Sequence, residues 1–224
     1  MADTAVKICG LQSVEVVKSL LHLPIEMIGL VFAKSRRQIA PGTAAQIVKV
    51  LQDEAAAGKP VPKSVGVFVN PSLEELELVL REAALDVVQL HGQESPEFCR
   101  SVKERFPVRI MKAMSVKDGE SRDTSRCLNS YQGFIDALLV DAYDPVYGGG
   151  SGTSFDWSAL APYQEWTKKS GIPLLVAGGL HEHNVQHLIA SYHPDGVDVS
   201  SGVEREGIKD INKITAFVER VKGI

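Results

Sequence analysis

Six ionisable side chains of this sequence stand where short apolar runs end, and together they could carry acid and base chemistry. They are Cys9, Arg36, Arg37, His91, Asp141 and Asp198. A thiolate or a carboxyl group can accept or donate a proton in catalysis, and a guanidinium group can orient a carboxylate. The set therefore indicates proton transfer on a small anionic substrate.

Two apolar runs near the C-terminus end in small residues, which suits the binding of phosphate. The predicted cup consists of Gly178 and Gly179 after the first run and Ser200, Ser201 and Gly202 after the second. One helix, residues 182–193, fits between the runs, so the two strands are expected to be parallel neighbours. In (β/α)8 barrels, the loops after the seventh and eighth strands hold phosphate in this way.

The whole chain repeats this strand and helix unit. Strands are predicted at 6–10, 27–32, 64–69, 86–92, 109–114, 137–141, 173–180 and 196–204, and helices at 14–23, 43–57, 73–85, from 95 onward, 118–130, 156–169, 182–193 and 210–221. Strict alternation implies parallel strands, either closed into a barrel or open and doubly wound. An open sheet more often has its glycine-rich loop after the first strand, where this chain has Gly10 alone. We therefore predict a single (β/α)8 TIM barrel domain over residues 1–224.

Composition narrows the class of protein further. The chain has 224 residues, 44% of them apolar, and a net charge of −4 with both signs interspersed, so nucleic acid is not an expected partner. Neither a signal sequence nor a membrane span is indicated, so a cytoplasmic protein is expected. Cys9, Cys99 and Cys127 fit reduced thiols, and the last two are predicted to pack within helices.

Each candidate catalytic residue has a structural alternative. Cys9 could be a buried small side chain, or a base or nucleophile that needs a nearby cation. Asp141 could cap a turn, or act as a general acid or base, because a partly desolvated carboxyl group can hold a proton near neutral pH. Strands one and six are three apart in a ring of eight, so the two side chains would face each other across the barrel mouth.

The remaining polar features are also open to two interpretations. Arg36 and Arg37 could form a solvated turn or a carboxylate site, and His91 could touch a ligand or act as a hydrogen-bonded spacer. His183 and His187 are spaced by four residues but lack the glutamate of a metalloprotease motif, so no metal site is expected. The glycine-rich stretch 147–157 fits neither nucleotide-binding pattern and is predicted to form a flap, fastened by Phe155 and Trp157.

Seven motifs, in order, resemble the phosphoribosylanthranilate isomerase family. They are Lys7-Ile-Cys-Gly10, residues 29–37, Gly66-Val-Phe-Val-Asn70, Val88-Gln-Leu-His-Gly92, Leu138-Leu-Val-Asp141 with residues 149–157, Ala177-Gly-Gly-Leu180 with Asn184 and Val185, and residues 197–204. The resemblance implies a (β/α)8 barrel that converts N-(5-phosphoribosyl)anthranilate to 1-(2-carboxyphenylamino)-1-deoxyribulose 5-phosphate in tryptophan biosynthesis. This Amadori rearrangement needs no metal or organic cofactor.

The resemblance also implies a role for each matched residue. Cys9 would be the general base and Asp141 the general acid, while Arg37, or failing it Arg36, would hold the anthranilate carboxylate. Gly178, Gly179, Ser200, Ser201 and Gly202 would bind the phosphate, and Asp198 would lie close to the sugar. Leu30, Gln38 and an extra glycine in the flap depart from the usual family pattern.

Two kinds of protein compete with this interpretation. An indoleglycerol-phosphate synthase would need lysine and glutamate on the rim, and Lys112 alone does not supply them; a sugar isomerase of histidine synthesis is a similar rival. A catalytically inactive protein that senses phosphorylated ligands would need neither Cys9 nor Asp141. The expected partner is a small phosphosugar substrate, and the protein is expected to be a monomer or a homodimer.

Overall fold

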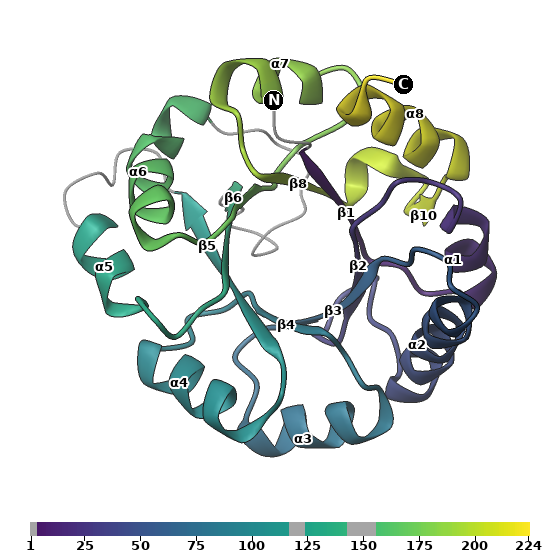
Figure 1. Ribbon diagram of the computed structural model, residues 1–224, viewed down its shortest axis with the longest axis horizontal. Coiled ribbons are helices and arrows are strands. Elements are labelled where there is room, and N and C mark those ends of the chain that lie inside the picture. The colour runs from purple at the N-terminus through teal and green to yellow at the C-terminus, as the bar shows by residue number, and fades with distance from the viewer. Residues whose placement is uncertain (1–3, 117–123, 143–155) are drawn as a thin grey trace.

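Eight parallel strands close into a barrel in the order β1-β2-β3-β4-β5-β6-β7-β8, and this confirms the predicted fold. The computed structural model describes residues 4–116, 124–142 and 156–224. Figure 1 looks down the barrel and shows the helices as an outer ring around the strands. The register is continuous around the ring, and Lys7 of β1 lies opposite Asp198 of β8 where the barrel closes.

The elements agree with the predicted units to within a few residues at most ends. The strands are β1 (Ala5–Cys9), β2 (Met27–Val31), β3 (Lys63–Phe68), β4 (Val87–Leu90), β5 (Arg109–Val116), β6 (Ala137–Ala142), β7 (Leu174–Val176) and β8 (Gly196–Val199). The helices are α1 (Val14–Leu20), α2 (Pro41–Ala56), α3 (Leu73–Glu82), α4 (Pro96–Arg105), α5 (Thr124–Ser130), α6 (Ala161–Ser170), α7 (Val185–Tyr192) and α8 (Ile211–Lys222).

Local sequence explains where several helices begin and end. Ser72 and Glu75 form a reciprocal capping box at the start of α3, and Ser95 caps α4 just before a proline in its first turn. At the other end, Gly171 and Gly223 close α6 and α8 in the left-handed conformation that glycine adopts without strain. These local signals set the helix ends, while packing against the barrel stabilises the helices.

Side chains that point into the barrel form a core separate from the one under the helices. The inner core contains Val65, Val87, Met111, Ala113, Leu139, Leu175 and Ala177. Nearer the C-terminal ends of the strands, Cys9, Val31 and Val67 form a smaller cluster. Apolar packing therefore fills most of the barrel interior, and the buried polar pair of Lys7 and Asp198 lies just below the level of Cys9.

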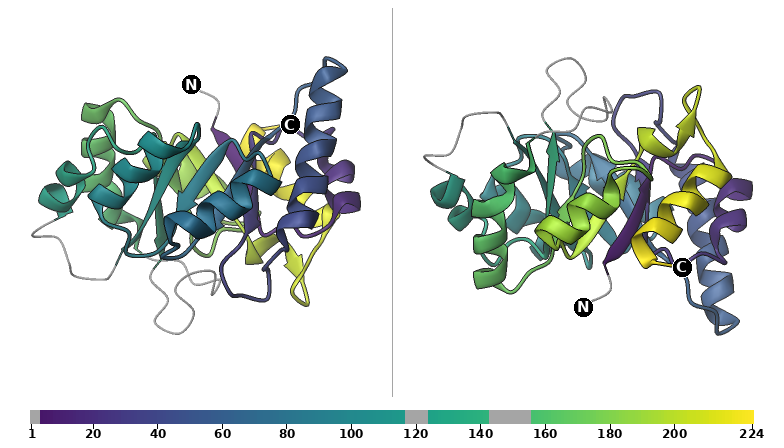
Figure 2. Two further views of the ribbon diagram at one scale, coloured as in Figure 1. Left: turned by 90° about the horizontal axis from the view of Figure 1, so that it is seen from below. Right: turned by 90° about the horizontal axis from the view of Figure 1, so that it is seen from above.

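Two elements differ from the prediction. A hairpin of β9 (Glu204–Arg205) and β10 (Ile208–Lys209) follows the short helix η2 (Ser201–Val203), where a plain connection was expected. Figure 2 shows this hairpin and the β2–α2 loop projecting from the same end of the barrel, opposite the end where β1 starts. The hairpin therefore adds side chains to the rim that carries the predicted site.

The prediction for Cys127 was wrong: Cys99 is buried, but Cys127 is exposed on α5. Because this helix is polar, its residue pattern does not predict which face packs inward. Helix η1 (Trp157–Leu160) precedes α6 and is capped by Asp156. Trp157 is buried against His187 and Tyr192, as expected for an anchor. Residues 147–155 of the predicted flap, Phe155 included, lie outside the described part of the chain.

Candidate active site

The predicted base, Cys9, lies beside a buried ion pair. Lys7 and Cys9 are two residues apart on β1, so their side chains lie on the same face of the strand and both enter the barrel. Nζ of Lys7 donates to Oδ1 of Asp198 at 2.9 Å. The neighbouring residue on β2 is Gly29, where a Cβ atom would lie 2.7 Å from Sγ of Cys9 and 3.1 Å from Nζ of Lys7. A side chain at this position would collide with Sγ of Cys9 and crowd Nζ of Lys7, so glycine leaves room for both groups.

The Cys9 thiol and the Lys7 ammonium group shift each other's pKa. Burial raises the pKa of the Cys9 thiol, and Asp198 adds to the rise, while Lys7 and Lys209 oppose it because they favour the thiolate. Burial alone would lower the pKa of Lys7, but Asp198 and Cys9 outweigh it, so that pKa is raised. Lys7 therefore stays charged next to the thiol and is the nearby cation that a cysteine base needs.

The predicted acid, Asp141, is the penultimate residue of β6 and is buried. Its Oδ2 lies 3.4 Å from Nε2 of His91, which follows β4. The other ring nitrogen of His91, Nδ1, is 2.8 Å from the amide nitrogen of Gln89. Within the described residues, Oδ1 of Asp141 and Oε1 of Gln89 are buried without a hydrogen-bond partner.

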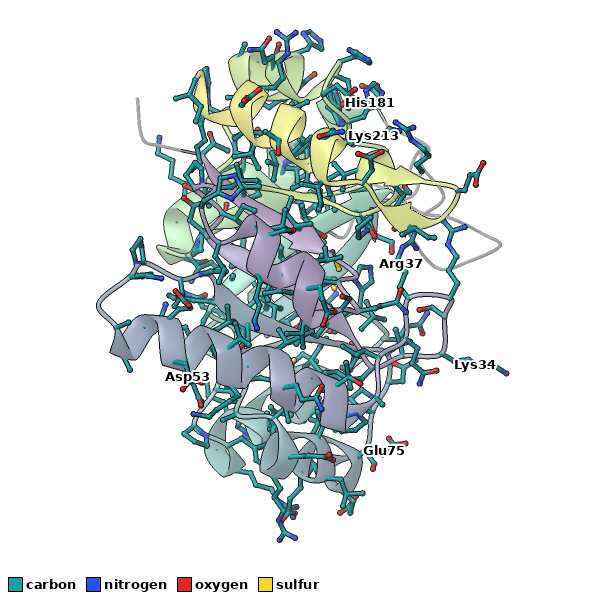
Figure 3. The ribbon with its side chains drawn as sticks, turned by 90° about the vertical axis from the view of Figure 1, so that its right-hand side faces the viewer. Lys34, Arg37, Asp53, Glu75, His181 and Lys213 are labelled. Atoms are coloured by element: carbon teal, nitrogen blue, oxygen red, sulfur yellow. The ribbon has the colours of Figure 1, made fainter. Side chains whose placement is uncertain are left out.

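Arg37 is held rigidly by a carboxylate that the sequence analysis did not single out. Its Nε and Nη2 donate to the two carboxylate oxygens of Glu204, at 2.7 Å and 3.0 Å. Arg36 reaches Glu204 through a single bond of 3.2 Å and is largely exposed. In Figure 3, Arg37 lies by the β9–β10 hairpin, whereas Lys34 of the same loop points away from the molecule.

Lys209 completes the cation cluster around Glu204. Its Nζ donates to Oε1 of Glu204 at 2.6 Å and to the carbonyl oxygen of Ser200 at 2.9 Å. Burial raises the pKa of Glu204, but Arg37 and Lys209 outweigh it, and the net shift is downward. With Arg36 included, three cations surround one carboxylate, so this part of the rim has excess positive charge.

The two predicted phosphate loops meet closely. A Cβ on Gly202 would lie 1.9 Å from the carbonyl oxygen of Leu180, so the loop after β8 touches the loop after β7 only because residue 202 is glycine. Gly178 and Gly179 have φ angles of +92° and +60°, which other residues adopt with strain. Asn184 accepts from the N–H of His181 and donates to the carbonyl oxygen of Gly179, and these bonds brace the first loop.

The structure thus places all the predicted site residues at one end of the barrel, whereas the ammonium group of Lys112 is buried in an ion pair. Lys112 points outward from β5, where its Nζ donates to Glu94 at 2.9 Å. The roles of Lys7, Glu204 and Lys209 were not predicted from the sequence. The strand pattern could have indicated Lys7, because it is two residues from Cys9 and its side chain lies on the same face of the strand. No sequence pattern indicated Glu204 and Lys209, because their hairpin was not predicted.

The sequence matches the family model described as N-(5'phosphoribosyl)anthranilate (PRA) isomerase over residues 6–220. The chain belongs to this family.

Relatives named as phosphoribosylanthranilate isomerases match over nearly their whole length. The N-(5'-phosphoribosyl)anthranilate isomerase of Brevibacillus brevis is 45% identical over 219 residues, which cover 98% of this chain and 94% of the relative. The crystal structure of the Thermotoga maritima isomerase has a TM-score of 0.82 at 37% identity, covering 99% of this chain and 100% of that one.

A further phosphoribosylanthranilate isomerase structure contains reduced 1-(o-carboxyphenylamino)-1-deoxyribulose 5-phosphate. It has a TM-score of 0.79 and 35% identity, and the match covers 99% of this chain and 100% of that one. The matched region of the family model includes every residue that we assign to the site.

Proposed function

We propose that this chain is a phosphoribosylanthranilate isomerase that converts N-(5-phosphoribosyl)anthranilate to 1-(2-carboxyphenylamino)-1-deoxyribulose 5-phosphate by acid and base catalysis. The observation that carries the assignment of roles is the presence of a buried thiol beside a lysine on β1 and a buried carboxyl group on β6, at the same end of the barrel. A protein that only binds a phosphosugar needs neither group.

Asp141 is the proposed general acid. In its protonated form it donates a proton to the ribose ring oxygen, and the ring opens to a Schiff base. Oδ1 is suited to this step, because it is buried and has no hydrogen-bond partner among the described residues. General acid catalysis of this kind contributes about a hundredfold to ten-thousandfold.

Cys9 is the proposed general base. Its thiolate removes the proton from C2 of the sugar, and the resulting enolamine tautomerises to the ketone product. Burial disfavours the thiolate, and the Lys7 ammonium compensates in part. The Lys7–Asp198 pair therefore holds a fixed positive charge where the negative charge of the base develops.

Two sites on the protein are proposed to bind the two ends of the substrate and so align the sugar between the acid and the base. The loops that meet at Gly202 suit the phosphate, with Gly178, Gly179, Ser200 and Ser201 supplying backbone groups. Arg37 suits the anthranilate carboxylate, since Glu204 already fixes the orientation of its fork. Asp198 lies near the sugar in this arrangement.

A direct assay tests the proposal. Phosphoribosylanthranilate generated in situ fluoresces, and we expect the purified wild-type protein to remove this fluorescence rapidly. Cys9→Ala and Asp141→Asn should each be slower by about a hundredfold or more. If wild-type protein does not accelerate the loss, the assignment of the reaction is wrong. If either variant matches the wild type, the role of that residue is wrong.

We further propose that residues 1–224 form one domain and that the enzyme works in the cytoplasm as a monomer or a homodimer. One closed barrel contains all the strands β1 to β8. A Thermotoga maritima isomerase is described as dimeric, with monomers generated from it. Among the described residues, no helix has the length and apolar character needed to cross a membrane. Light scattering on the purified protein would distinguish monomer from dimer.

A further inference from the structure

The side-chain amide of Gln89 lies against one ring nitrogen of His91. Both residues point into the barrel at the end of β4, and the amide nitrogen of Gln89 lies 2.8 Å from Nδ1 of His91. An amide nitrogen can only donate, so Nδ1 must accept. A neutral imidazole ring then carries its proton on Nε2.

The protonated nitrogen of His91 faces one particular oxygen of Asp141. Nε2 lies 3.4 Å from Oδ2. This distance is longer than an ordinary N–H···O hydrogen bond, and the proposal requires it to shorten when substrate binds, as catalytic hydrogen bonds do. Oδ1 of Asp141 is buried and has no partner among the described residues. The two oxygens of the acid are therefore in different environments.

We propose that His91 is a positioning residue that directs the Asp141 proton to the substrate through Oδ1, and that Gln89 sets the tautomer of His91 for this task. A carboxylic acid has one oxygen that accepts and one that carries the proton. Once this contact shortens, Nε2–H occupies Oδ2 and the proton resides on Oδ1. This inference rests on the proposed function, in which Asp141 is the general acid.

The proposed arrangement also assists the proton transfer itself. The O–H bond at Oδ1 breaks, a new O–H bond forms at the ribose ring oxygen, and Asp141 becomes a carboxylate. The negative charge then strengthens the hydrogen bond from Nε2–H to Oδ2, because a charged acceptor binds a donor more strongly. The interaction is stronger in the transition state than in the ground state, so its loss should affect kcat more than KM.

The tautomer can be measured without any assay of activity. In protein labelled with ¹⁵N-histidine, His91→Gln identifies the His91 signals by their absence. We expect His91 to be the Nε2–H tautomer, and Gln89→Leu to increase the share of the Nδ1–H form. A wild-type His91 with its proton on Nδ1, donated to Oε1 of Gln89, would overturn the inference.

Two conservative variants test the effect on catalysis. Glutamine at position 91 places an amide nitrogen near the site of Nε2, whereas asparagine reaches only the site of Nδ1. We expect His91→Gln to keep kcat within about fivefold of wild type, and His91→Asn to lose about tenfold to a hundredfold in kcat with KM nearly unchanged. Thermal melts establish that each variant is folded.

The outcomes separate this inference from the proposed function. Equal kcat in the two folded variants, or a change confined to KM, would overturn the role of His91 while wild-type activity stands. An inactive wild-type protein would instead count against the proposed reaction, and the tautomer measurement would still decide whether Gln89 sets the protonation of His91.

Discussion

Arg37 and Glu204 form a two-point ion pair between the β2–α2 loop and the β9–β10 hairpin, with distances of 2.7 Å and 3.0 Å. The pair holds the guanidinium plane in place before any ligand arrives. The Arg37 side chain also packs against Gly10, the residue directly after the strand that carries the base, where a Cβ would lie 2.6 Å from Cδ of Arg37. A pre-oriented arginine next to Gly10 loses little rotamer entropy when it binds a carboxylate.

The first prediction compares the two adjacent arginines. Arg37→Ala should raise KM by about tenfold or more with a smaller change in kcat, because a bidentate carboxylate anchor is lost. Arg36→Ala is the matched control and should change KM by less than about threefold, since the Arg36 side chain is 62% exposed and makes one long bond to Glu204. Steady-state kinetics measure both KM values. A larger rise in KM for Arg36→Ala than for Arg37→Ala would show that Arg36, and not Arg37, binds the carboxylate.

The second prediction concerns acid stability. The pKa of Glu204 is lowered in the folded protein from its ordinary value of 4.5, so its stabilising effect is complete above that pH and is lost as the pH falls through the folded value. Glu204→Gln should therefore lower the free energy of unfolding at pH 7, and this difference from wild type should shrink below about pH 4.5.

Urea unfolding at a series of pH values measures this difference. Glu206→Gln serves as a control, because Glu206 is an exposed residue of the same hairpin turn. A deficit in Glu204→Gln that stays constant from pH 7 to pH 3 would show that the ion cluster does not account for the stability.

The third prediction uses the reactivity of the cysteines. Cys127 is exposed, whereas Cys9 and Cys99 are buried, and burial raises the pKa of Cys9 and takes that of Cys99 to about 11. Because the thiolate is the reactive form, iodoacetamide at pH 7 should modify Cys127 first and leave activity intact. Mass spectrometry of digested protein locates the label. Rapid modification of Cys9 at pH 7 would mean that its thiolate is already well populated in the free enzyme.

The sequence predicted those features of the site that depend on local pattern. Cys9 and Asp141 were found because each ends a buried strand, and the fold followed from the alternation of elements. The Lys7–Asp198 pair was missed because its members are 191 residues apart and meet only where β8 closes on β1. The Arg37–Glu204 pair depends on a two-residue hairpin strand, which is too short to give a periodic signal.

The fourth prediction tests the buried pair beneath Cys9. Lys7→Met should cost about 3 to 5 kcal/mol of stability, because it leaves the Asp198 carboxylate buried without its cation. In protein that remains folded, the same change should slow the alkylation of Cys9 at a given pH, since the loss of the neighbouring charge disfavours the thiolate. Alkylation of Cys99 is the internal control. An unchanged Cys9 rate would show that Lys7 serves stability alone.

The last prediction concerns the contact between the phosphate loops. A Cβ at Gly202 would lie 1.9 Å from the carbonyl oxygen of Leu180, and backbone atoms cannot move aside as the end of a flexible side chain can. Gly202→Ala should therefore separate the loops and raise KM for the phosphorylated substrate, with inorganic phosphate becoming a weaker competitive inhibitor. Gly42→Ala is the matched control, because the new Cβ there would meet only the carboxylate of Glu82, at 3.1 Å. If Gly202→Ala left both KM and the inhibition by phosphate unchanged in a folded protein, phosphate would have to bind elsewhere than where these two loops meet.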